Sequence, residues 1–123
     1  MLYQKEGEKP VYALEGSLEC GAQNVNWVRD TFKGFDSDFT VMNQRVNERA
    51  QEEPNSSVLF LPSFSGIMAP YWTNSPACLV GLTANTDAVS VYRACLDGIA
   101  FRVNDCLQSF GESVEVILFG LKN

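Results

Sequence analysis

Hydrophobic side chains that recur at steps of three and four residues predict three amphipathic helices in this chain. The pattern places them over residues 18–33, 35–53 and 86–110. The last helix has the most regular pattern, because its apolar stripe continues for roughly five turns. The stripe consists of Tyr92, Leu96, Ile99, Val103, Cys106 with Leu107, and Phe110. Gly98 lies in the middle of this helix, where a glycine often allows a neighbouring strand or helix to approach closely.

The first two helices each have one predicted apolar face. In the first helix this face consists of Leu18, Ala22, Val25, Val28 (or Arg29) and Phe32. In the second helix it consists of Phe39, Met42, Val46 and Ala50. The mixed charges on the other side of the second helix predict a solvated surface made by Arg45, Glu48, Arg49, Glu52 and Glu53. Trp27 lies off the centre of the first face, so we expect it at the boundary of the core.

Polar residues and glycines mark the predicted helix ends. The predicted N-terminal caps are Ser17, Ser37 and either Asn85 or Thr86, and the predicted stops are Gly34 and Gly111. Asp87 falls in the first turn of the last helix, where its charge is favourable to the helix dipole. Asp36 and Asp38 flank Ser37 and are interpreted as helix-start residues rather than as metal ligands.

Short apolar runs bounded by turn residues predict three strands, over Val11–Leu14, Val58–Leu61 and Val114–Phe119. Residues 1–10 are polar and are expected to form a loose N-terminal segment. Strands that alternate with helices predict an α/β fold, in which the helices pack on a sheet. The long connection over residues 62–83 contains prolines, glycines, tyrosine and tryptophan, so it is either a functional loop or a lid that packs on its own domain.

The composition is that of a single soluble domain. A chain of 123 residues suffices for one core, and a net charge of −6 disfavours binding to nucleic acid or an anionic membrane. No apolar run approaches the ~20 residues of a membrane-spanning helix, and the polar N-terminus lacks the apolar core of a signal peptide. We therefore expect a cytoplasmic protein that binds neither nucleic acid nor membrane.

The inventory of reactive side chains excludes several kinds of catalysis. The chain has no histidine, so Ser-His and Cys-His catalysis and histidine metal sites are excluded. The four cysteines, Cys20, Cys78, Cys95 and Cys106, show no CxxC spacing and are interpreted as small, reduced core side chains. The sequence also lacks the GxxxxGK[ST] pattern of a phosphate-binding P-loop.

Several short segments together resemble a known family. They are Tyr12-Ala13-Leu14-Glu15-Gly16, Trp27-Val28-Arg29-Asp30, Pro62-Ser63-Phe64-Ser65-Gly66, Ala69-Pro70-Tyr71-Trp72, Gly81-Leu82-Thr83 and the run from Arg93 to Arg102. In order and spacing they resemble the C-terminal domain of glycerol kinases, within the FGGY carbohydrate kinases. The resemblance implies that residues 11–123 are part of that domain. The implied fold is an incomplete second domain of an actin-like, ribonuclease H-like ATPase fold, in which nucleotide lies between two domains.

The resemblance also implies an activity and its cofactors. The activity is transfer of the ATP γ-phosphoryl group to glycerol with Mg²⁺. The family's catalytic aspartate and most of its glycerol contacts lie upstream, in an N-terminal kinase domain, so no catalytic residue is expected in this chain. The family's second glycine-rich nucleotide loop would follow Val114–Phe119 and is not recognisable there. We therefore expect a fragment that is inactive alone and exposes apolar patches; the resemblance leaves a homo-oligomer open.

One nucleotide-contact segment of the family aligns with the first predicted helix. There the family has a glycine and, four residues later, a polar residue near the nucleotide. Alignment on Trp27 places these positions at Ala22 and Asn26, with Gly21 next to the replaced glycine. Gly21, Ala22 and Asn26 are therefore the candidate nucleotide-binding residues. The alternative is a helix that serves only packing.

The segment after Trp72 departs from the family pattern. The family has Asp-Pro and then Ala-Arg-Gly, whereas this chain has the residues of Thr73–Cys78. The missing arginine is a planar anion-binding group that serine and asparagine do not replace. Two alternatives to a glycerol kinase therefore stay open: a non-catalytic, kinase-like interaction module, and another sugar kinase of the same family.

Overall fold

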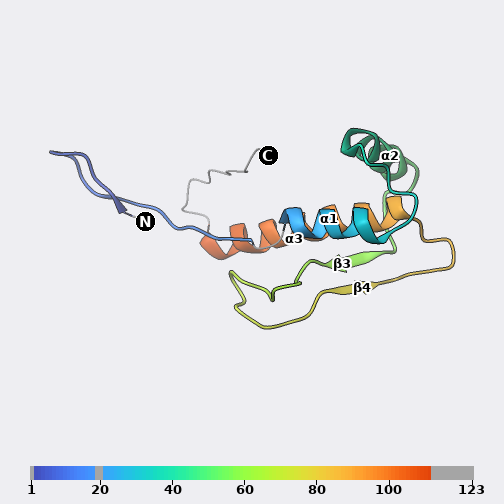
Figure 1. Ribbon diagram of the computed structural model, residues 1–123. Coiled ribbons are helices and arrows are strands. Elements are labelled where there is room, and N and C mark those ends of the chain that lie inside the picture. The colour runs from blue at the N-terminus through green and yellow to red at the C-terminus, as the bar shows by residue number, and fades with distance from the viewer. Residues whose placement is uncertain (1, 19–20, 112–123) are drawn as a thin grey trace.

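The computed structural model describes residues 2–18 and 21–111 (Figure 1). In chain order, the elements are β1 (Leu2–Tyr3), β2 (Val11–Tyr12), α1 (Gly21–Thr31), α2 (Phe39–Glu52), β3 (Leu59–Leu61), β4 (Cys78–Val80) and α3 (Ala88–Phe110). The predicted helices are thus confirmed, with α1 and α2 each shorter than expected. The predicted strand over Val114–Phe119 lies outside the described residues.

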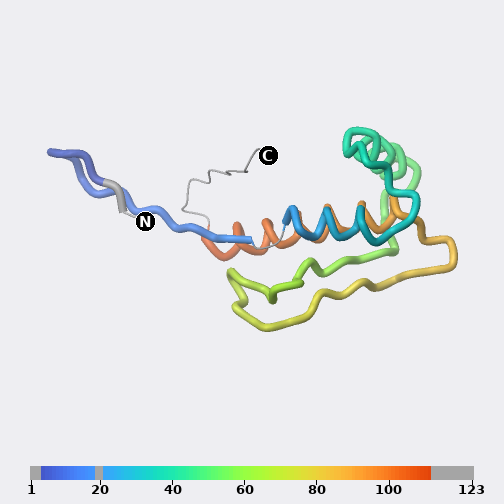
Figure 2. Tube along the Cα trace, viewed as in Figure 1, coloured from blue at the N-terminus to red at the C-terminus, as the bar shows by residue number. Residues whose placement is uncertain are grey.

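The described strands form two separate antiparallel pairs, β1 with β2 and β3 with β4. The first pair joins part of the segment expected to be loose, Leu2–Tyr3, to Val11–Tyr12. This hairpin projects away from the helices (Figures 1 and 2). The rest of the described chain is one packed unit, in which α3 contacts β3, α1 and α2. The expected arrangement of helices on strands is therefore present, built around α3.

The core forms where α1, α3 and β3 meet. Phe60 of β3 is buried and stacks on Trp27 of α1, with ring centroids 5.8 Å apart. Trp27 also makes edge contacts with Phe32 and Phe64, at 5.6 and 5.0 Å. Trp27 is therefore a partly buried core-boundary residue, as predicted. The apolar run that predicted this strand also suggests a buried one, but side chains alternate along a strand, and Leu59 is 56% exposed on the face opposite to Phe60.

The backbone of α3 lies directly against β3 at Gly98. A β-carbon at this position would overlap the carbonyl oxygen of Phe60 and lie 3.1 Å from Cδ of Pro62. The close approach expected from a mid-helix glycine is therefore confirmed. The most buried stripe of α3 also differs from the predicted one, because it follows this contact: it runs through Val91, Cys95, Gly98, Arg102 and Cys106. A pattern that counts only apolar side chains misses a stripe with a glycine and an arginine at its centre.

The face that α1 buries is also turned from the predicted one. Asn24 and Val28, one turn apart, are both fully buried, whereas Ala22 is exposed. The prediction used apolar residues only, so it placed Ala22 on the buried face and left out Asn24, whose side chain is an amide. Ser17 does not cap α1, because Leu18 after it is not helical.

Aspartates, rather than the predicted residues, cap the other two helices. Asp38 caps α2 in place of Ser37, accepting a hydrogen bond from the Thr40 amide at 2.8 Å. Asp87 caps α3 in place of Asn85 or Thr86, accepting from the Ser90 amide at 2.8 Å. A carboxylate accepts these bonds with its charge favourable to the helix dipole, which a hydroxyl lacks. Gly111 ends α3 as predicted.

Two arginines join α2 to α3. Arg49, predicted to face solvent, donates to the carboxylate of Asp87 at 2.9 Å and to the hydroxyl of Ser90 at 3.3 Å. Arg93 of α3 is 8% exposed and donates to the carbonyl oxygens of Glu53 and Pro54 just after α2. The carbonyls at this helix end therefore find donors on a neighbouring helix, which fixes the end of α2 before β3 begins.

We expect substitution Gly98→Ala to destabilise the protein by about 1–3 kcal/mol, because the added methyl group overlaps the backbone of Phe60. This is opposite in sign to the gain of ~1 kcal/mol that alanine gives over glycine in an open helix. Urea unfolding followed by circular dichroism measures the change. The control Ala100→Gly changes an exposed position of the same helix and should lose only ~1 kcal/mol. An unchanged or raised stability of the Gly98→Ala variant would contradict the close contact.

The cap at Asp87 predicts a pH-dependent contribution to stability. Burial acts to raise the pKa of this carboxyl, but hydrogen bonds from Ser90 and Arg49 outweigh it and hold the pKa below its usual value. A lowered folded-state pKa means that the stabilisation is present above the unfolded-state pKa and is lost as the pH falls through the folded-state pKa. Asp87→Ala should cost about 1–2 kcal/mol at pH 7, and this cost should shrink toward pH 3. The control is Asp30→Asn, at an exposed position, which should change stability little. A loss of stability in Asp87→Ala that does not depend on pH would argue against the charged cap.

Candidate functional site

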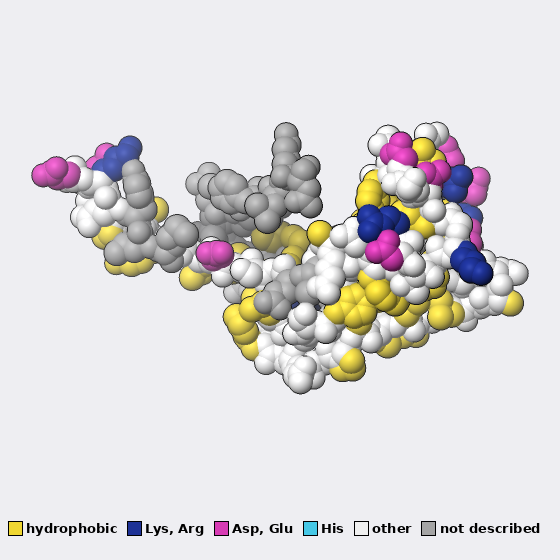
Figure 3. All heavy atoms as spheres, in the orientation of Figure 1, with side chains coloured by type: hydrophobic (Ala, Val, Ile, Leu, Met, Phe, Trp, Pro, Cys, Tyr) yellow, Lys and Arg dark blue, Asp and Glu magenta, His cyan; other side chains and the backbone are white. Residues whose placement is uncertain are grey.

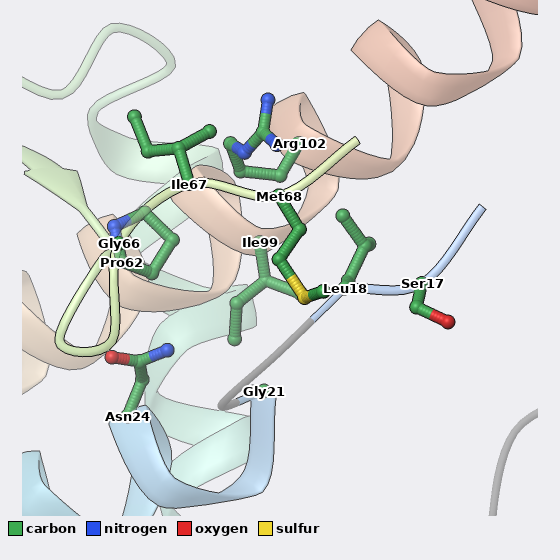
Figure 4. A pocket seen from close by; sticks show the side chains of 10 residues that line it. All are labelled: Ser17, Leu18, Gly21, Asn24, Pro62, Gly66, Ile67, Met68, Ile99 and Arg102. Atoms are coloured by element: carbon green, nitrogen blue, oxygen red, sulfur yellow. The ribbon is translucent and has the colours of Figure 1, made fainter. Parts of the chain in front are cut away.

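A small recess lies at the start of α1, where this helix meets α3 and the connection after β3. It is lined by Ser17, Leu18, Gly21, Asn24, Pro62, Gly66, Ile67, Met68, Ile99 and Arg102 (Figure 4). Figure 4 shows Gly21 and Asn24 of α1 on one side, Ile67 and Met68 on the other, and Ile99 of α3 between them. Its volume is about 20 Å³, which has room for roughly one water molecule. A larger ligand would therefore contact the outer surface around it.

The structure divides the three candidate nucleotide-binding residues between two places. Gly21 lines the recess, and no atom lies within 4 Å of the position that a β-carbon would take there. Ala22 and Asn26 are exposed on the adjoining surface of α1. Because they are four residues apart, these two side chains lie on the same face of the helix. The recess and this exposed face together form the candidate site.

Two buried polar residues of the recess, Asn24 and Arg102, were not predicted from the sequence to face inward. Asn24 is fully buried and lies three residues after Gly21 and four before Val28. That helical spacing is a usable signal, but polar residues are usually placed on the outer face of a helix. Arg102 was not found because a buried arginine interrupts the apolar stripe of α3.

The connection after β3 folds back on itself over residues 67–73, which we call the aromatic loop. Ile67 and Thr73 exchange two backbone hydrogen bonds of 2.8 and 2.9 Å, which close the loop. Ile67 and Met68 pack into the recess, while Tyr71 and Trp72 are 59% and 70% exposed. The alternative of a lid that packs on its own domain therefore holds for one end of the aromatic loop, while the other end presents aromatic rings to solvent, and a functional role of the loop stays a prediction.

Trp72 has a left-handed backbone conformation, with φ of 49°. For a bulky residue this conformation is uncommon and costs on the order of 1–3 kcal/mol. Such a conformation persists only where surrounding contacts hold it. The amides of Tyr71 and Trp72 both donate to the carbonyl oxygen of Met68 at 2.9 Å, which contributes to holding the turn.

Arg102 of α3 contacts the aromatic loop through a hydrogen bond and through the ring of Tyr71. One terminal nitrogen donates to the carbonyl oxygen of Ala69 at 2.5 Å, and the other donates to the carboxylate of Asp105 at 3.0 Å. The guanidinium also lies over the ring of Tyr71, 5.2 Å from its centroid. One turn along, the thiol of Cys106 lies 3.2 Å from the same Ala69 oxygen. Arg102, Ala69, Tyr71 and Asp105 are called the Arg102 anchor below.

The described acidic and sulfur side chains do not gather into a cluster of metal ligands. Across residues 2–18 and 21–111, no three His, Cys, Asp or Glu side chains converge to hold a metal ion. Asp36 accepts a hydrogen bond from the amide of Asp38, and Asp38 caps α2, so both are helix-start residues as predicted.

Among residues 2–18 and 21–111, no helix is long and apolar enough to cross a membrane.

An apolar groove of about 430 Å³ lies between α3 and the β3–β4 pair. Leu59, Val80 and Phe101 line it and are 56%, 55% and 61% exposed. In the space-filling view, hydrophobic side chains also reach the surface on the face that carries α1 (Figure 3). The expected exposure of apolar side chains is therefore present.

Comparison with known proteins adds a family and its relatives. The profile of the FGGY family of carbohydrate kinases, C-terminal domain, matches residues 2–119. Glycerol kinase of Mycoplasma pneumoniae is 36% identical over 117 residues, which cover 91% of this chain and 22% of that protein. Glycerol kinase of Acidiphilium cryptum is 35% identical over 123 residues, covering 99% of this chain and 24% of that protein. The chain therefore spans roughly a fifth to a quarter of the length of these relatives.

Solved structures resemble the same part of the chain. The crystal structure of Plasmodium falciparum glycerol kinase with ADP has a TM-score of 0.69 and 33% identity, covering 85% of this chain and 20% of that one. The structure of ligand-bound xylulose kinase from Lactobacillus acidophilus has a TM-score of 0.56 and 27% identity, covering 76% of this chain and 19% of that one. Both support the predicted fold class, part of the second domain of an actin-like ATPase fold.

The described cysteines differ in their accessibility. Cys95 and Cys106 are buried, as predicted, whereas Cys78 on β4 is exposed, so the interpretation as a core residue is wrong for Cys78. Cys20 lies outside the described residues. Burial raises the pKa of the Cys95 thiol to about 12, which keeps it protonated and unreactive at neutral pH.

We predict that Cys78 reacts with iodoacetamide at pH 8 while Cys95 stays unmodified until the protein unfolds. Mass spectrometry of the digested protein identifies the modified positions. Because the folded-state pKa of Cys95 is raised, its contribution to stability is present below the unfolded-state pKa and is lost as the pH rises toward 12. Cys95→Ala should therefore weaken the loss of stability above pH 9, and Cys78→Ala should leave it unchanged. Equal labelling of Cys78 and Cys95 in the folded state would contradict the burial.

Proposed function

This chain belongs to the FGGY family of carbohydrate kinases, and we propose that it forms one wall of the nucleotide cleft in a glycerol kinase. The proposed reaction is transfer of the γ-phosphoryl group of ATP to a hydroxyl of glycerol. The likeness to a glycerol kinase solved with ADP is the observation that carries the proposal. Because the chain spans about a quarter or less of its relatives, the activity is proposed for the longer protein.

The proposed contacts to the nucleotide come from the start of α1. Ala22 and Asn26 lie one turn apart on an exposed face, where the small side chain of Ala22 leaves room for a ligand and the amide of Asn26 can donate a hydrogen bond. Gly21 adds open space beside them. Backbone amides at a helix start also favour anionic groups such as phosphates. These features support Gly21, Ala22 and Asn26 as the nucleotide-binding residues.

The remaining parts of the reaction are proposed to lie outside this chain. Phosphoryl transfer needs Mg²⁺ and a base positioned at the attacking hydroxyl. Because the chain spans about a quarter or less of its relatives, we assign Mg²⁺ and the base to an N-terminal kinase domain that faces this wall. We also assign the longer protein to the cytoplasm, where the buried thiols of Cys95 and Cys106 stay reduced.

Two other functions remain candidates on specific observations. The likeness to a xylulose kinase favours a pentulose as an alternative acceptor. The replacement of the family's acidic and basic residues by Thr73–Cys78 favours a kinase-like module without catalytic activity. Glycerol is preferred because glycerol kinases match the chain at higher identity and with a higher TM-score.

We expect ADP to bind this chain and to shift the amide signals of Gly21, Ala22 and Asn26 in a nuclear magnetic resonance titration. Asn26→Leu should weaken ADP binding about two- to tenfold, because it removes one hydrogen bond. The matched control is Asn47→Leu, an exposed asparagine of α2, which should not change binding. Shifts confined to other parts of the chain would contradict the assignment of these residues.

Activity assays distinguish the three candidate functions. The 123-residue chain alone should not phosphorylate glycerol, because the proposed base and metal site lie elsewhere. The longer protein should phosphorylate glycerol faster than D-xylulose. A preference for xylulose would favour the pentulose kinase, and a longer protein that fails to bind ATP would favour the non-catalytic module.

A further inference from the structure

The aromatic loop lies outside the hydrophobic core cluster and contacts α3 through polar groups, while Ile67 and Met68 pack at the recess. The core cluster of the described chain joins α1, α2, α3 and β3, and none of the residues 67–73 belongs to it. The polar contacts of the loop with α3 include the Arg102 anchor, in which the side chain of Arg102 is 10% exposed. A buried arginine that pairs with a carboxylate and a backbone carbonyl is strongly oriented, because each partner fixes one of its terminal nitrogens.

The anchor engages the guanidinium at three places. Its two terminal nitrogens donate to Ala69 and Asp105, and its central carbon lies over the ring of Tyr71, 5.2 Å from the ring centroid. A lysine has neither the fork of donors nor the planar face, so it cannot hold these three partners together. Arg102 is therefore the main polar link between the loop and α3, and the thiol of Cys106 adds one contact to the same Ala69 oxygen.

The same arginine lines the recess at the start of α1. Arg102 takes part in that wall together with Ile67 and Met68 of the aromatic loop and with Gly21 of α1 (Figure 4). A loop that left Arg102 would carry Ile67 and Met68 out of the recess and would open the surface beside Gly21. Arg102 thus joins the position of the aromatic loop to the shape of the candidate nucleotide site.

We propose that Arg102 is a positioning residue, which fixes the aromatic loop on α3 and thereby sets the wall beside the nucleotide-binding start of α1. The effect on nucleotide rests on the proposed function, whereas the effect on the loop does not. Arg93 provides a matched comparison, because it is equally buried on the same helix but donates to carbonyls at the end of α2, away from the loop.

Hydrogen exchange measured by mass spectrometry tests the effect on the loop. The amides of Ile67 and Thr73 bond each other's carbonyls across the loop and report its opening. Arg102→Gln should speed exchange over residues 67–73 by about tenfold or more, with little change in β3 and α2. Arg93→Gln should speed exchange at the end of α2 and leave the loop unchanged. Equal acceleration throughout the chain, or none in the loop, would overturn the proposal.

Two further variants keep the test decisive if Arg102→Gln folds poorly. Arg102→Lys should still open the loop, because lysine retains the charge without the fork and the planar face. Tyr71→Leu removes only the stacked ring at an exposed position and should open the loop partly. In the double variant with Arg102→Lys, the two effects should be less than additive, because both act through one anchor. Additive effects would show that Arg102 and Tyr71 act separately and would overturn the anchor.

ADP titration of the same variants tests the coupling to nucleotide. Arg102→Gln should weaken ADP binding about fivefold or more, and Arg93→Gln should leave it unchanged. An Arg102→Gln variant with an open loop and unchanged ADP affinity would overturn the coupling. If the unmodified chain does not bind ADP, the proposed function fails, and the exchange experiment still decides whether Arg102 positions the loop.

Discussion

At Gly98 the backbone of α3 lies against the carbonyl of Phe60 in β3, with no space for a side chain between them. Because of this contact α3 packs closely against β3, and Val91 and Cys95 of the same helix are fully buried in the core. The side chain of Phe60 stacks on the ring of Trp27, and this contact packs α1 against β3. Because protein interiors are packed to nearly crystalline density, the positions of α1 and α3 relative to each other follow from these contacts to one strand residue.

Two buried arginines extend this arrangement to the segments on either side of β3. Arg93 holds the carbonyls after α2, and Arg102 holds the aromatic loop, so one helix fixes both the entry to the strand and the long connection that leaves it. Backbone carbonyls in such connections have no partner within a helix or sheet, and a desolvated guanidinium supplies one. The irregular segments are thus positioned by polar contacts where the apolar core does not reach.

This division has a consequence for the proposed kinase. The packed unit of α1, α3 and β3 presents an exposed helix face with Ala22 and Asn26, and a loop with exposed aromatic rings. Binding residues are commonly carried on such surfaces, at the edge of a scaffold that does not move. The reactive groups of phosphoryl transfer would then come from another domain, as expected for a cleft that closes between two halves.

The sequence alone was sufficient for the three helices and the α/β class, because periodic apolar positions and turn residues act locally. The family followed separately, from the resemblance of several short segments to glycerol kinases. It also predicted that Gly98 would allow a close approach. Tertiary structure decided which polar residues are buried: Asn24 faces the recess, Arg102 holds Ala69 and Tyr71, and Asp87 rather than its neighbours caps α3. A buried polar side chain depends on partners far away in the sequence, so the local pattern that predicts a helix cannot identify it.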